Sequence, residues 1–439
     1  MPSPTAPSRL RVALRIVGVF FAILIIVVAI GAWRGVLPNF EKRVAAIQAA
    51  GQPGAASDLP LSTPLSAEHQ AQLKALIQAM DRLSNAVPSM RRLKAGNPVF
   101  LETAALRKEV LSLLQADPVV SQLLQPDPSL EPFEGYQDSM NRMILLKQVE
   151  VFLRFASLDA LKRGQVDDAL GCLTNAIRLR LLPEPFVQSP DFWSLDVAPF
   201  NRLLVEMVDS RKLHARHLDQ LHQAYKTFES APLFRNHLLG ERHWHISNTR
   251  ELAGTSLSDF SDTPRSDGRL NSFTDWLWLR ARLHLGFLDT AGCAVLDEIG
   301  AQLADLDRIG EPALLRESRQ RQSRIRSRFP RIQNLCDIPQ NFLETGALLP
   351  KTHARLGLLA IAVARYRLDH AGEFPSSPSD LVPRYLSALP VDPYSGGPPE
   401  FGPNHPGVAI GFDRSRLTGP DAIPPTTPGG SSARIRLEK

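Results

Sequence analysis

An uninterrupted apolar segment near the N-terminus constrains this chain more than any other feature of its sequence. Residues 16–33 read IVGVFFAILIIVVAIGAW and carry no charged side chain. As an α-helix such a run rises about 27 Å, close to the roughly 30 Å of a bilayer's hydrocarbon core. Because backbone polar groups in lipid must find their partners within the segment, the run is expected to be helical. The sequence therefore predicts one transmembrane helix over residues 16–33.

The charges beside this segment predict its orientation. The preceding tail, residues 1–15, carries three arginines and no acidic residue. A short basic tail before an apolar run is how a secretory signal begins, and long domains cross a membrane largely regardless of flanking charge. We therefore expect a cytoplasmic tail and an extracytoplasmic, periplasmic region over residues 34–439. Small residues at 29–31 would suit cleavage, but the run is longer than that of a cleaved signal, which favours an uncleaved signal-anchor.

Composition limits the remaining possibilities. The chain has 439 residues and a formal net charge of +5, with 44% hydrophobic and 22% charged residues. This is the composition of a folded protein, and the small charge excess requires no nucleic-acid partner. Three cysteines are too few for a disulfide scaffold and too widely spaced for a zinc-finger array. In an oxidising compartment one pair among Cys172, Cys293 and Cys336 could form a disulfide, but the sequence does not select the pair.

Helical periodicity dominates the rest of the chain. Residues 34–66 predict a juxtamembrane helix followed by a linker rich in Gly, Pro and Ser, and residues 67–345 predict an α-helical body. The predicted helices cover roughly 100–116, 137–163, 166–182, 199–210, 214–229, 234–250, 270–289, 293–308, 311–328 and 350–370. Strand signals occur only after Pro390. The predicted fold is therefore mainly α, with a small C-terminal α+β unit over residues 346–439.

One helical hairpin, residues 137–182, has a recognisable design. Small residues recur along it at Ser157, Ala160, Gly164, Ala169 and Ala176. Small side chains at such positions let two antiparallel helices approach closely, while leucines between them fill the seam. The spacing resembles a tetratricopeptide hairpin, although a solenoid needs about three copies and one is visible. An ordinary αα-hairpin and a peptide-binding repeat array both remain open.

The C-terminal unit carries the most specific local signals. A helix over 350–370, with one apolar face flanked by arginines, ends at Gly372. Ser377 then caps a short helix with Asp380 at its third position, a capping-box arrangement. A turn over 392–396 leads to strands at GVAIGF and ARIRL, residues 407–412 and 433–437. Between the strands, the Pro- and Gly-rich run 419–432 is predicted to be a mobile loop because it has little to bury.

This order of elements resembles the C-terminal region of the major pseudopilins of type II secretion systems. There too a helix is followed by a short helix and by an LPxDPxxG run, here residues 389–396, that leads into β-strands. The sequence departs from that family in two places. The apolar run lacks the early Glu of prepilin-peptidase substrates, and only Asp413 and Asp421 stand near the position of the family's calcium-binding loop. We therefore expect neither a true pseudopilin nor a calcium ligand.

The whole layout resembles a group of uncharacterised, planctomycete-type bacterial envelope proteins. These have an N-terminal anchor, a helical body with an alanine-rich hairpin, a GER motif and the same pseudopilin-like end. Gly240, Glu241 and Arg242 form that motif here. The resemblance implies an envelope location and no known activity.

The sequence offers weak candidates for a metal site. His237, Glu241, His243 and His245 lie together in NHLLGERHWHIS. On a helix His237 and Glu241 share a face and would bind zinc if a third ligand came from elsewhere. Arg242 would oppose a bound cation, so solvated or paired side chains are the favoured interpretation. Without a GxSxG, Walker or GxGxxG motif, we predict no catalytic residue and no cofactor.

An arginine-rich run is the candidate for an anionic partner. It comprises Arg316, Arg319, Arg321, Arg324, Arg326, Arg328 and Arg331. Spacings of two or three residues cover more than one helix face, so a solvated helix surface is the simpler interpretation. The alternative is a patch for lipid head groups, a cell-wall polymer or an acidic protein face.

These observations lead to two functional hypotheses. The first is a membrane-anchored extracytoplasmic structural, assembly or interaction protein of the bacterial envelope, associated with a secretion or pilus-like system. Its partners would be the lipid bilayer and other envelope proteins or an anionic polymer, and not nucleic acid. The alternative is a membrane-anchored extracytoplasmic hydrolase whose site is not recognisable from sequence.

Overall fold

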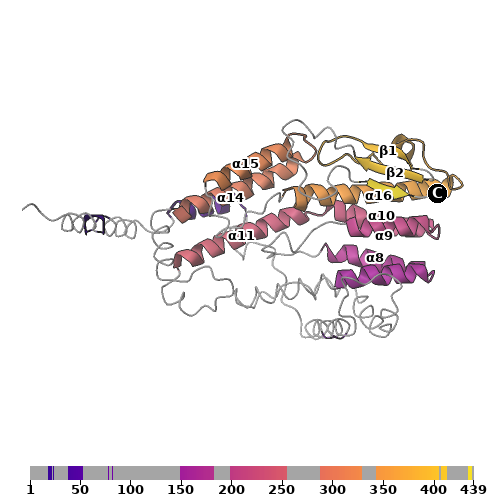
Figure 1. Cartoon of the computed structure of the whole chain (residues 1–439), viewed down its shortest axis with the longest axis horizontal. Helices are drawn as coiled ribbons and strands as arrows, with labels where there is room; N and C mark the ends of the chain where they lie inside the picture. Colours follow the sequence, from indigo (N-terminus) through magenta and orange to yellow (C-terminus); the bar gives the residue numbers. More distant parts are fainter. Residues whose placement is uncertain are drawn as a thin grey trace, which may run out of the picture. The chain divides into compact units, whose positions relative to one another are not determined.

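The computed structural model of the chain shows mainly helices with one small sheet (Figure 1). It describes residues 18–21, 23, 38–52, 78, 82, 149–181, 198–254, 287–328, 343–404, 407–412 and 434–437. The mainly α prediction is thereby confirmed. Most of the predicted transmembrane segment and the predicted loop 419–432 lie outside the described residues.

The chain divides into two compact units. Unit 1 combines residues 1–58, 242–299 and 325–337, and unit 2 combines residues 59–241, 300–324 and 338–439. Residues 346–439 thus belong to the same compact unit as most of the helical body.

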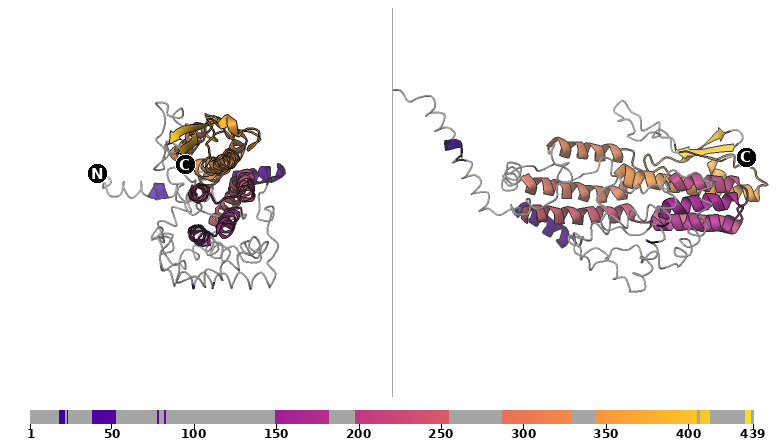
Figure 2. Two further views of the ribbon diagram at one scale, coloured as in Figure 1. Left: turned by 90° about the vertical axis from the view of Figure 1, so that its right-hand side faces the viewer. Right: turned by 60° about the horizontal axis from the view of Figure 1, so that its bottom comes forward.

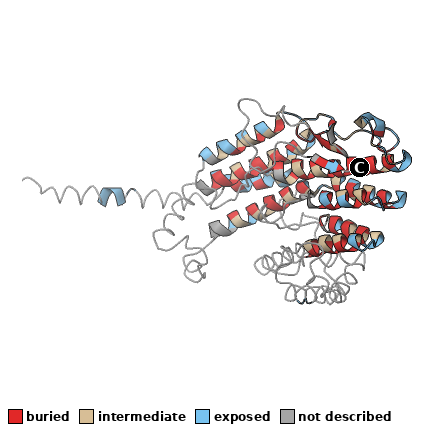
Figure 3. Ribbon diagram, turned by 45° about the vertical axis from the view of Figure 1, so that its right-hand side comes forward, coloured by how far each residue is buried: buried red, intermediate tan, exposed pale blue. Residues whose placement is uncertain are grey.

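Unit 2 is built around helix α16, Leu349–Asp369. It packs against α9 (Ala198–Asp209), α10 (Ala215–Ser230) and the C-terminal sheet. The sequence predicts one apolar face for this helix, but residues 356–364 are all buried (Figure 3). These residues are buried all round the helix because α9 and α10 pack on one side of it and the strands pack on the other. Among the described residues, one helical stretch, Gly346–Asp369, is long and apolar enough to cross a membrane. However, 78% of its apolar window is buried inside the protein.

The predicted hairpin is confirmed at its close contact. A helix over residues 149–162 is followed by α8, Val166–Leu179, with Gly164 at a positive φ of 77° in the turn. Ser157 Oγ donates a hydrogen bond to the Ala169 carbonyl at 2.8 Å. Ala169 and Ala176 have no exposed surface. The small residues thus lie where the two helices touch.

A second hairpin, α9 and α10, continues from the first. Arg211 occupies a positive φ of 56° in its turn, where glycine would be the easier residue. Helix α10 packs against both α8 and α16, which places the hairpins and the sheet in successive layers (Figures 1 and 2). The buried ring of His217 joins the hairpins, since its Nε2 lies 3.0 Å from Asp167 Oδ1 on α8.

The C-terminal end of unit 2 follows the predicted order. Helix α16 stops where the Gly372 N–H donates to the Arg367 carbonyl at 2.8 Å. The 3₁₀ turn η6, Pro378–Leu381, has the predicted capping box between Ser377 and Asp380. Packing of Leu381 into the core then fixes this turn on the helical body.

Three antiparallel strands complete unit 2 in the order β1-β2-β3. The predicted strands are observed as β2, Gly407–Phe412, and β3, Arg434–Leu437. An additional strand, β1, Pro399–Asn404, pairs with β2. Alternate β2 residues Val408, Ile410 and Phe412 are buried, as expected of a sheet with one face on a core.

Unit 1 contains helix α2, Pro38–Ala49, which lies where a juxtamembrane helix was predicted, together with parts of α11 (Leu233–Gly254) and α14 (Phe287–Asp305). The fully buried Phe40 donates its backbone N–H to Asp289 at 2.6 Å. A Cβ at Gly292 would approach the Phe40 ring to 2.8 Å, so this glycine makes room for the ring. The predicted break between residues 289 and 293 is therefore wrong, because α14 continues through Gly292.

Candidate binding pocket

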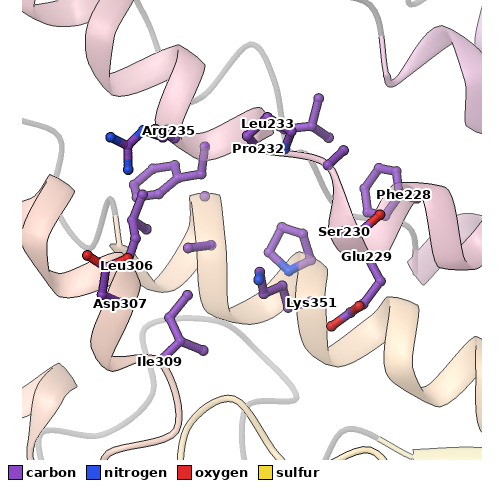
Figure 4. Close-up of a pocket in the computed structure, with 15 residues that line it drawn as sticks. Phe228, Glu229, Ser230, Pro232, Leu233, Arg235, Leu306, Asp307, Ile309 and Lys351 are labelled. Atoms are coloured by element: carbon purple, nitrogen blue, oxygen red, sulfur yellow. The ribbon is translucent and has the colours of Figure 1, made fainter. Parts of the chain in front are cut away.

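A cavity of about 200 Å³ opens in unit 2 where four segments meet (Figure 4). The end of α10, the start of α11, the short helix η3 (Leu306–Arg308) and the turn before α16 each contribute to its wall. Its apolar lining residues include Phe228, Leu233, Phe234, Leu306, Ile309 and Pro350. A mostly apolar cavity with a few polar groups is the usual form of a small-ligand site.

The helix that forms one wall of the pocket is irregular at that point. Residues Glu344–Leu348 form a π-helical turn, η5, in which the Leu349 N–H donates to the Glu344 carbonyl. Pro350 follows and has no N–H to donate. A Cβ at Gly346 would lie 2.3 Å from a carbon of the Phe234 ring, so only glycine allows this packing. Such π-helical turns occur frequently at functional sites.

Four charged residues line the pocket. Figure 4 shows Glu229 and Lys351 at one end and Arg235 and Asp307 at the other. Arg355, the next cation on α16, holds the Glu229 carboxylate, with Nε 3.0 Å and Nη2 2.9 Å from Oε1. Burial lowers the pKa of the Lys351 ammonium group, Glu229 opposes this shift and Arg355 adds to it. Two cationic side chains, Lys351 and Arg355, therefore interact electrostatically with the single Glu229 carboxylate.

The candidate metal ligands lie along α11 in different surroundings. His237 Nε2 is 3.8 Å from Glu241 Oε1, and burial lowers the pKa of His237 to about 4. His243 Nε2 instead lies 3.4 Å from Ser247 Oγ. Within unit 1, His245 packs edge-on to Phe40, and burial lowers its pKa also to about 4. His237 and His245 are thus neutral at pH 7. In the described part of the chain no three His, Cys, Asp or Glu residues are grouped to hold a metal ion.

The arginine-rich run lies largely on α15, Leu314–Arg328. Arg319 donates to Glu344 Oε2 at 2.6 Å, and Arg321 forms an ion pair with Asp305. These two guanidinium groups therefore hold unit 2 together. Within the run, the side chains of Arg316, Arg324 and Arg328 are exposed. Arg326 also lies on the helix, and Arg331 lies outside the described residues. Ion pairing within the protein thus reduces the charge that the proposed patch presents.

The two described cysteines are not joined to each other in a disulfide. Cys172 is buried on the hairpin seam, and Cys293 on α14 is half-buried. Burial raises the pKa of the Cys293 thiol, with Asp289 and Asp297 adding to the shift. A raised pKa keeps the thiol protonated and makes it a poor nucleophile. Cys336 lies outside the described residues.

Comparisons with family models, curated proteins and solved structures found no match to this chain. The pseudopilin and envelope-protein resemblances therefore remain predictions. The pocket itself was not predicted, because its wall comes from segments around residues 230, 307 and 348 that are far apart in sequence. The local signal that could have drawn attention to it is Pro350 within an otherwise helical, apolar run.

Proposed function

We propose that this protein is a single-pass, membrane-anchored binding or assembly protein of the bacterial envelope, with residues 34–439 outside the cytoplasm. The observation that carries the proposal is the exposure of large apolar side chains at its N-terminal helix. Val19, Phe20, Phe21 and Ile23 are 59%, 71%, 60% and 55% exposed. Elsewhere in the described residues, the exposed large apolar side chains are those of Leu368 and Val391. A contiguous apolar surface of this kind needs a lipid or protein partner.

The architecture of unit 2 supports a binding role. Two helical hairpins pack in layers with α16, and the pocket offers apolar walls with few polar groups. An association with a secretion or pilus-like system is supported by the helix, capping box, turn and small sheet of the C-terminal end. The partners we propose are the lipid bilayer and other envelope proteins or an anionic polymer. No observation on the described residues favours the hydrolase alternative.

Membrane fractionation tests the anchor. The full chain is expected to stay in the membrane pellet after an alkaline carbonate wash and to be released by detergent, because residues 16–33 insert as a helix. A variant with Phe20 and Phe21 both changed to Asp should shift to the soluble fraction, since charges within the apolar run are costly in lipid. The matched control changes Leu368 and Val391 to Asp, which adds the same charges at exposed apolar positions far from the run. Recovery of the full chain in the carbonate supernatant would contradict the anchor.

A further inference from the structure

We propose that the pocket binds a small carboxylic acid with a compact apolar group, either free or as the C-terminal residue of a peptide, and that Lys351 pairs with its carboxylate. This goes beyond the proposed function, because it depends on neither the anchor nor an envelope partner. The juxtaposition that carries it is an apolar cavity with a half-buried ammonium group on its wall.

The size of the cavity limits the ligand. An apolar cavity of about 150 Å³ holds a benzene molecule, so the roughly 200 Å³ found here fits a group somewhat larger than one ring. The rings of Phe228 and Phe234 are buried, at 4% and 6% exposure, and form fixed walls. The close packing of Phe234 on Gly346 fixes that ring in the wall of the cavity. A six-carbon chain or a single ring is therefore the size of apolar group expected.

The balance of charge selects an anion. Lys351, Arg355 and Glu229 together carry a net charge of +1, and Arg355 already holds the carboxylate. At the opposite end, Arg235 and Asp307 are exposed and of opposite sign, so they add no net charge. A ligand carboxylate would supply the missing negative charge beside Lys351, where removal from water makes an ion pair stronger. An amine would instead meet the Lys351 ammonium group, and the Glu229 carboxylate that lines the same end is already paired with Arg355.

The test uses the purified full chain in a non-ionic detergent and three ligands of equal length. Isothermal titration calorimetry with hexanoate, hexanol and hexylamine is expected to give hexanoate a Kd at least tenfold lower than either of the others. Lys351→Met should weaken hexanoate binding at least tenfold and leave hexanol binding unchanged. Lys226→Met, the same change on the exposed face of α10, is the matched control and should alter neither.

Further arms identify the source of the carboxylate and challenge the proposal. N-acetyl-leucine binding more tightly than hexanoate would identify a peptide C-terminus, and the reverse order a free acid. Gly346→Ala should weaken all binding, because the added Cβ would displace Phe234 and so reshape the wall of the cavity. Equal binding of hexanoate and hexanol, tighter binding of hexylamine, or no binding at millimolar concentration would each overturn the proposal. None of these outcomes bears on the membrane anchor.

Discussion

Gly357→Ala is expected to destabilise unit 2 by about 3 kcal/mol, the upper end of the usual cost of overpacking. Gly357 lies within the buried helix α16, and a Cβ there would approach two carbons of the Tyr225 ring to 2.2 and 2.5 Å. Tyr225 has no exposed surface, so the ring has no free space to move into. Chemical denaturation of the full chain, followed by near-ultraviolet circular dichroism, measures the change.

Gly171→Ala provides the matched control for this prediction. Gly171 lies within helix α8, and a Cβ there would have nothing within 4 Å. The same substitution should therefore stabilise the protein by about 0.5–1 kcal/mol, the penalty of glycine in a helix interior. Equal effects of the two substitutions would show that α10 and α16 do not pack closely through Gly357.

Glu150→Leu is expected to cost about 3–5 kcal/mol, because it removes a carboxylate that is ion-paired with a buried cation. Glu150 and Arg180 form an ion pair between the two helices of the first hairpin, and each side chain is only 7% exposed. Arg154 also lies in the electrostatic field of both residues. Removal of Glu150 therefore leaves two guanidinium groups that repel each other in a partly dry environment.

The double variant Glu150→Leu with Arg180→Met separates the ion pair from simple packing. Replacing a buried pair by apolar residues of similar size is often neutral, so the double variant should recover most of the stability lost. Thermal and denaturant unfolding of the unchanged protein, Glu150→Leu, Arg180→Met and the double variant gives the coupling energy. If the double variant were less stable than Glu150→Leu alone, Arg180 would stabilise the protein by more than its ion pair with Glu150, and the prediction would be wrong.

Local sequence signals predicted the secondary structure well wherever they were strong. The helix stop at Gly372, the capping box at Ser377 and the strands after residue 407 each depend on residues close together in the chain, and each was confirmed. Strand β1 was missed because PEFGPN contains few residues that favour strands and owes its conformation to pairing with β2.

Interactions between distant residues explain what the sequence could not predict. The arginines beside the apolar positions of α16 indicated a solvent-facing side for that helix. In the structure Arg355 pairs with Glu229 and Arg365 with Asp219, partners more than a hundred residues away. Their charges are thus neutralised at the edges of a buried helix. The pocket escaped prediction for the same reason, since its aromatic walls, Phe228 and Phe234, lie more than a hundred residues before Lys351.

A reporter fusion tests the central claim, a membrane-anchored protein whose bulk lies outside the cytoplasm. A fluorescent protein that matures only in the cytoplasm, fused after Lys439, is expected to stay dark, whereas alkaline phosphatase at the same position should be active. The same pair fused after residue 15, without the rest of the chain, should give the opposite pattern and serves as the control. Bright fluorescence and inactive phosphatase after Lys439 would contradict the account.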